Sequence, residues 1–112
     1  MSTIAITRAI RNLIIIAMMF TVSLGVSAKE DAAAIESGRK LVAEAKCETC
    51  HVSKFGGDGS SIYTRKDRRV TTLAKLQPQV SRCSTDLNLG LFPDDEAAIA
   101  AYLNSRHYKF KE

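Results

Sequence analysis

The sequence predicts an all-α fold, and three observations support that prediction. One stretch after residue 31 is rich in Ala, Glu, Lys and Leu, and another near the end is rich in Ala; all of these are good helix formers. Between the two stretches, apolar residues recur at intervals of three and four, as on one face of a helix. No segment alternates apolar and polar residues as a half-buried strand does.

The first 28 residues have the three-part layout of a secretory signal peptide. Arg8 and Arg11 make a positive start, residues 13–26 are largely apolar, and small residues follow at 26–28. The apolar stretch of 14 residues is shorter than the ~17–25 that cross a bilayer. We therefore expect cleavage after Ala28 and a periplasmic location, with membrane attachment only if the peptide is retained.

The mature chain, residues 29–112, is then one small domain of 84 residues. So short a domain buries little apolar surface and usually needs additional stabilisation from a disulfide or a bound metal. Without the two leader arginines, 14 basic residues remain against 12 acidic ones, so the net charge is only +2. This charge gives no indication of a nucleic-acid partner.

We expect the first helix from Ala32 to Cys47, with Ser37-Gly38 as its weak point, followed by a glycine-rich loop within residues 52–61. A middle helix is expected from Val70 to Cys83, kinked or split at Pro78. Its apolar face consists of Leu73, Leu76, Val80 and Cys83.

The last helix is expected from Ala97 to Asn104. Pro93 and three acids at 94–96 precede it, where the positive end of a helix dipole favours negative charge. An apolar-leaning loop, residues 87–92, leads into these acids, and an aromatic and basic tail begins at Tyr108.

Cys47, Cys50 and His51 form a C-x-x-C-H run, the signature of covalent c-type haem attachment. Each thiol would add to one vinyl group of the haem, and the imidazole would bind one axial face of the iron. A zinc site would need a second ligand pair, and only Cys83 and His107 remain, far apart in the sequence. A redox dithiol is expected beside a strand–helix–strand pattern, which this chain lacks. We therefore expect haem c as the cofactor.

The order of a helix before C-x-x-C-H, a glycine loop, a middle helix and a terminal Ala-rich helix resembles the class I cytochrome c fold over essentially the whole mature chain. The resemblance implies three to four helices around one covalently attached haem. In that family a small residue of the first helix lets an aromatic residue of the last helix pack across it, and Gly38 and Tyr102 match that pair. Relatives often have a proline after the motif whose carbonyl orients the imidazole. This chain lacks it, so the sequence does not identify the acceptor for the His51 ring N–H.

A second departure from the family concerns the sixth iron ligand. Met1, Met18 and Met19 are the only methionines and all lie in the signal peptide, so the usual thioether is missing from the mature chain. The remaining candidates are Cys83, Asn88, His107 and lysines such as Lys75. The alternative for Cys83 is an inert buried thiol or one half of an intermolecular disulfide.

The stretch around Cys83, together with Tyr102-Leu103-Asn104 and Tyr108-Lys109-Phe110, is similar to the small NaxLS-type cytochromes. Those are monohaem proteins with His/Cys ligation that pair as heterodimers and bind nitric oxide and carbon monoxide. The resemblance implies that Cys83 is the distal ligand, that a second small cytochrome is a partner, and that NO or CO is a ligand.

A thiolate ligand would favour ferric iron and a low reduction potential, and its loss on reduction would open a site for a diatomic gas. Three hypotheses follow: a gas-binding haem protein, an electron carrier for a redox partner protein, and a non-catalytic haem subunit of a larger periplasmic oxidoreductase. No set of side chains indicates an enzyme.

A basic cluster precedes the expected middle helix and consists of Arg65, Lys66, Arg68 and Arg69. This cluster is either a docking surface for an acidic partner or a solvated loop.

Overall fold

The structure is a computed structural model that describes the backbone of residues 26–111 and the side chains from residue 31 onward. The described residues are helical and contain no strand, which confirms the all-α prediction. Asp31–Glu112 form one compact unit. The signal-peptide prediction falls almost wholly outside the described residues. Among the described helices, none is both long and apolar enough to span a membrane.

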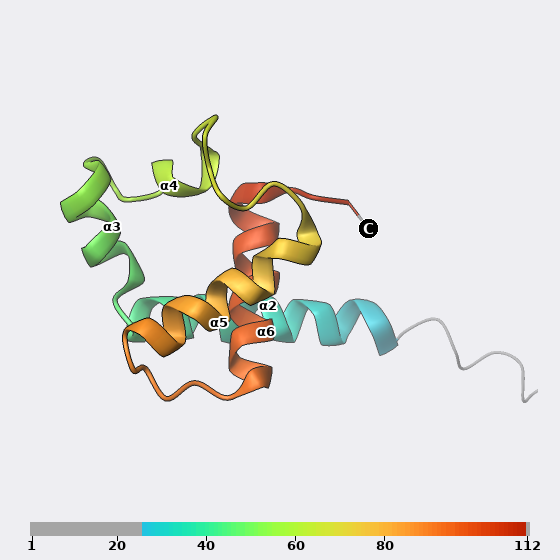
Figure 1. Cartoon of the computed structure of the whole chain (residues 1–112). Helices are drawn as coiled ribbons and strands as arrows, with labels where there is room; N and C mark the ends of the chain where they lie inside the picture. Colours follow the sequence, from blue (N-terminus) through green and yellow to red (C-terminus); the bar gives the residue numbers. More distant parts are fainter. Residues whose placement is uncertain (1–25, 112) are drawn as a thin grey trace, which may run out of the picture. The chain divides into compact units, whose positions relative to one another are not determined.

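Five α-helices, one 3₁₀ turn and one π-helical turn follow each other along the described chain (Figure 1). They are α2 (Val26–Glu44), α3 (Cys47–Phe55), α4 (Ser61–Thr64), η1 (Leu73–Lys75), α5 (Leu76–Asp86), α6 (Pro93–Leu103) and η2 (Asn104–Tyr108). The three to four helices that we expected are therefore too few. The motif begins a helix of its own, and a short α4 follows the glycine loop.

The boundary between α2 and α3 corrects the expected first helix, which was to run into Cys47. Lys46 has a φ of 52°, a left-handed conformation that breaks a right-handed helix, so α2 ends at Glu44. A new helix then starts at Cys47 and continues to Phe55, so it includes the first four residues of the segment that we expected to be a loop. Gly56, with a φ of 73°, ends that helix and opens the glycine loop.

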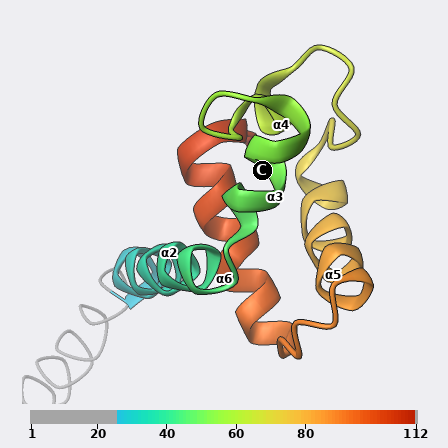
Figure 2. The ribbon, with the colours of Figure 1, turned by 90° about the vertical axis from the view of Figure 1, so that its left-hand side faces the viewer.

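The helices α2 and α6 lie against each other (Figure 2). Gly38 of α2 is at their point of closest approach, against Ala98 and Ile99 of α6. A Cβ atom built on Gly38 would overlap the carbonyl of Ala98, 2.5 Å from its carbon and 2.9 Å from the Ile99 nitrogen. Only glycine lets the two backbones approach so closely. A close crossing at Gly38 is thus confirmed; the atoms nearest to it belong to Ala98 and Ile99, and Tyr102 packs half-buried against the core.

The core lies where α5 packs on α6. Its most buried members are Leu76 of α5, 1% exposed, and Ile99 of α6 and Val70, each 3% exposed. The middle segment consists of η1 and α5, which meet between Lys75 and Leu76, slightly before the break expected at Pro78. Pro78 lies in the first turn of α5, where a missing N–H costs no hydrogen bond.

The last helix begins at Pro93, one turn before the expected Ala97. The backbone N–H of Phe92 donates to the Asp95 carboxylate at 3.0 Å, so an acid of the first turn caps the helix. Acids at this end also meet the positive end of the helix dipole. The signals that predicted the helix therefore belong to its first turn rather than to a segment ahead of it.

Candidate functional site

Cys47, Cys50 and His51 lie on one face of α3, because positions i, i+3 and i+4 of an α-helix are neighbours. Both thiols are free; Cys47 is half-buried and Cys50 is exposed. Of the five described α-helices, α3 alone has no buried side chain. The helix that carries the motif therefore contributes no buried side chain, and its contact with the core is made by the half-buried Cys47.

The His51 ring is held by Tyr63, a residue that the sequence did not single out. The Tyr63 hydroxyl lies 3.1 Å from His51 Nδ1, and the two rings meet edge to face with centroids 5.4 Å apart. Tyr63 is only 5% exposed, and burial also raises the pKa of its hydroxyl. With Nδ1 engaged, Nε2 is the ring nitrogen that remains for a metal ion.

The charge state of His51 suits a ligand role. Burial lowers the pKa of its imidazole below the usual value, and Lys54 contributes to the decrease while Glu48 opposes it. The ring is therefore neutral at pH 7, the state in which imidazole binds metals. The sequence identified His51, but only the structure shows which of its nitrogens is already engaged.

Gly59 brings the loop against α3 and thereby brings Tyr63 to the histidine. A Cβ atom at Gly59 would lie 2.9 Å from the Cβ of His51 and 3.0 Å from the Glu48 carbonyl oxygen, and φ here is 81°. Asp58 closes the turn by accepting hydrogen bonds from the Ser60 N–H at 2.9 Å and from the Ser60 hydroxyl at 2.6 Å. α4 starts directly afterwards and carries Tyr63 on its buried side.

Cys83 lies on α5. Burial raises the pKa of the Cys47 thiol, and Glu48 and Cys83 both add to that rise. Cys83 is exposed, and its sulfur accepts a hydrogen bond from Gln79 Nε2 at 3.4 Å. The alternative of a buried thiol is therefore wrong, whereas an intermolecular disulfide at Cys83 stays a prediction.

The expected apolar face of the middle helix needs a correction at the same position. The buried residues of α5 are Leu76, Val80 and Ser84, which are four apart, so Cys83 lies at the edge of the buried face rather than within it. At that edge the Cys83 thiol is exposed.

The other candidates for the distal position lie elsewhere. His107 stacks on Tyr63 with ring centroids 4.6 Å apart and planes tilted by 30°. It therefore packs against the tyrosine that contacts His51, the candidate for the proximal ligand. Asn88 is exposed in a left-handed turn after α5, and Lys75 donates to the Thr71 hydroxyl at 3.3 Å. Of the four, Cys83 is the one that adds to the raised pKa of the Cys47 thiol, after burial and Glu48.

Two of the four cations in the basic cluster already have partners within the chain. Arg65 forms an ion pair with Asp67 that lowers the Asp67 pKa to about 2, and its guanidinium lies 5.1 Å from the Phe55 ring. Arg68 donates to the Val70 carbonyl at 3.0 Å and lies 5.9 Å from the Tyr108 ring. The docking surface that the sequence suggested remains a prediction that would depend mainly on the exposed Lys66 and Arg69.

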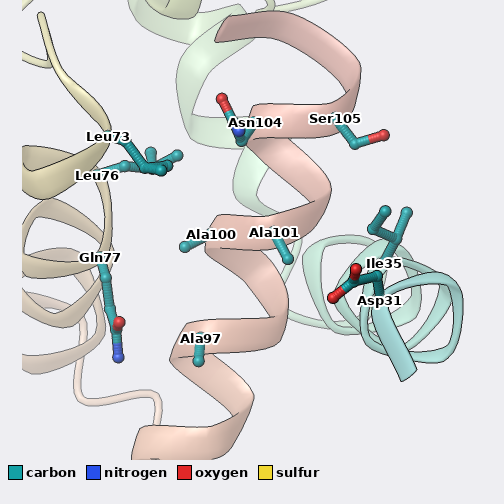
Figure 3. A pocket seen from close by; sticks show the side chains of 10 residues that line it. All are labelled: Asp31, Ile35, Leu73, Leu76, Gln77, Ala97, Ala100, Ala101, Asn104 and Ser105. Atoms are coloured by element: carbon teal, nitrogen blue, oxygen red, sulfur yellow. The ribbon is translucent and has the colours of Figure 1, made fainter. Parts of the chain in front are cut away.

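A groove of about 430 Å³ lies away from the motif, along α6 (Figure 3). Ala97, Ala100 and Ala101 form its floor, and Ile35 and Leu73 border it on either side. Within the described part of the chain, no group of three or more His, Cys, Asp or Glu side chains is arranged to hold a metal ion. A haem iron takes four ligands from its porphyrin and needs at most two from the protein.

Comparisons of this chain with protein-family models, with curated proteins and with solved structures give no match. The function must therefore be inferred from the site itself. The structure brings Cys47, Cys50 and His51 to one helix face, places Tyr63 against the imidazole, and leaves the Cys83 thiol exposed on α5.

Proposed function

We propose that this chain is a periplasmic, monohaem c-type cytochrome with a class I-like fold. Cys47 and Cys50 would hold the haem through thioether bonds, and His51 would be the proximal ligand through Nε2. The main support for the proposal is that these three side chains lie on one helix face and that a hydrogen bond between Nδ1 and Tyr63 leaves Nε2 of the imidazole free. The lack of buried side chains on α3 supports it, because a haem would supply the apolar surface that this helix lacks.

We propose Cys83 as the distal ligand, as in the NaxLS-type cytochromes that the sequence resembles. Its exposure and its electrostatic effect on Cys47 support this assignment. A thiolate carries a full negative charge to the iron, so it stabilises the ferric state. Protonation turns it into a poor ligand, which makes the bond labile.

The function would then be one-electron transfer at low potential, with NO or CO binding when Cys83 leaves the iron. The bound haem supplies the redox change and the coordination position, and the chain supplies the attachment, the axial ligands and the shielding from water. The partners would be a redox protein and a second small cytochrome. The alternative is a haem subunit of a larger oxidoreductase, which would co-purify with that enzyme.

The attachment is tested by expressing the full chain in a bacterium that has the cytochrome c maturation machinery. The wild-type band should retain haem peroxidase staining on a denaturing gel. Cys47→Ser/Cys50→Ser should lose it, because both thioether bonds are gone. Cys83→Ser is the matched control and should retain the stain, since it changes a ligand and not an attachment bond. An unstained wild-type band would refute the proposal.

A further inference from the structure

We infer that Tyr63 is the positioning residue of the proximal ligand, and that its hydroxyl sets the orientation and basicity of the His51 imidazole. This inference depends on the proposed haem attachment. The sequence lacks the proline whose carbonyl often has this role in class I relatives, and the structure provides a side-chain oxygen 3.1 Å from Nδ1. The acceptor that the sequence could not identify is therefore a tyrosine 12 residues further along the chain.

The direction of this hydrogen bond follows from the ligation. When Nε2 bonds to iron, the remaining ring proton is on Nδ1, so Nδ1–H donates and the Tyr63 oxygen accepts. Such a bond fixes the ring plane and increases the electron donation of the imidazole to the metal. Greater donation favours ferric over ferrous iron.

Tyr63 is held firmly enough for that role. Its ring is buried, stacks on His107 and meets Tyr108 edge to face, with centroids 5.8 Å apart. Those two residues belong to η2, and the tail beyond is tied back by Asn104, which accepts from the Phe110 N–H at 2.9 Å and donates to its carbonyl at 3.2 Å. The C-terminal segment thus packs behind the tyrosine that orients the ligand.

The test is the reduction potential of purified, haem-loaded Tyr63→Phe, which loses the hydroxyl and retains the ring. Mutation of a residue that hydrogen-bonds to a metal ligand typically lowers metal affinity or activity 10–100-fold. We expect the equilibrium constant for reduction to rise on the order of tenfold, which is about 59 mV for a one-electron couple. Tyr102→Phe is the matched control, because it removes a half-buried hydroxyl outside the site and should leave the potential unchanged.

A Tyr63→Phe potential equal to that of wild type and Tyr102→Phe would overturn the inference. If wild type carries covalent haem in that case, the proposed function stands and only the role of Tyr63 fails. If Tyr63→Phe does not mature, nitrogen-15 NMR of histidine-labelled wild-type protein decides instead. A slowly exchanging Nδ1–H of His51, with a nuclear Overhauser effect to Tyr63, is expected. A rapidly exchanging proton without that effect would overturn the inference.

Discussion

Replacement of Gly38 by Ala should destabilise the domain, because a methyl group has no room at the crossing of α2 and α6. The added carbon would lie 2.5 Å from the carbonyl carbon of Ala98 and 2.9 Å from the Ile99 nitrogen. These are backbone atoms, which cannot rotate away as a side chain can. The two helices would have to move apart, and the buried Ile99 and its neighbours would lose contacts.

The magnitude follows from two opposing effects. Overpacking of a core costs ~1–3 kcal/mol and occasionally more, and the backbone clash puts Gly38→Ala at the upper end of that range. Alanine regains about 1 kcal/mol of helix propensity relative to glycine. The free energy of unfolding should therefore fall by about 2 kcal/mol. For a domain of this size, that lowers Tm by roughly 8–16 °C.

Thermal unfolding of the haem-loaded protein, followed by far-ultraviolet circular dichroism, measures this effect. Ser37→Ala is the matched control, since Ser37 is the exposed neighbour of Gly38 on the same helix. It should be neutral or raise Tm slightly, because alanine is the better helix former. A Gly38→Ala protein that melts at or above the wild-type temperature would show that the helices do not cross closely here.

Two further predictions concern the distal ligand and the loop. Cys83→Ala should lose the narrow spread of low-spin g values in ferric electron paramagnetic resonance that thiolate ligation gives; an unchanged spectrum would refute Cys83 as the ligand. Gly59→Ala should destabilise the fold by ~1–3 kcal/mol in denaturant unfolding, because φ is positive and the new carbon meets α3. Gly57→Ala, at a positive φ in open space, is its control and should cost less; equal losses would show that contact with α3 is unimportant.

The elements with local signals were predictable from the sequence. Pro93 and the acids after it are typical of the first turn of a helix, so they indicated where α6 begins. The predicted start, Ala97, was too late by only that turn. The place of Pro78 in the first turn of α5 follows from the chemistry of one residue. The C-x-x-C-H spacing is equally local, and it places its three side chains on one face of any helix that forms there.

The features that depend on distant contacts were not predictable. Lys46 adopts a left-handed conformation although no glycine or proline is adjacent to it. The break between α2 and α3 therefore had no signal in the sequence. The pairing of His51 with Tyr63 depends on the close approach of Gly59 to α3. One clue was present, because a tyrosine directly after a glycine loop can fold back on the helix before it.

The intact mass of the purified, exported protein is the decisive test of covalent haem attachment. We expect the mass of residues 29–112 plus one covalently bound haem, and the pigment should remain with the polypeptide through acid–acetone extraction. A polypeptide of the unmodified mass, or a pigment that the solvent removes, would contradict haem attachment at Cys47 and Cys50.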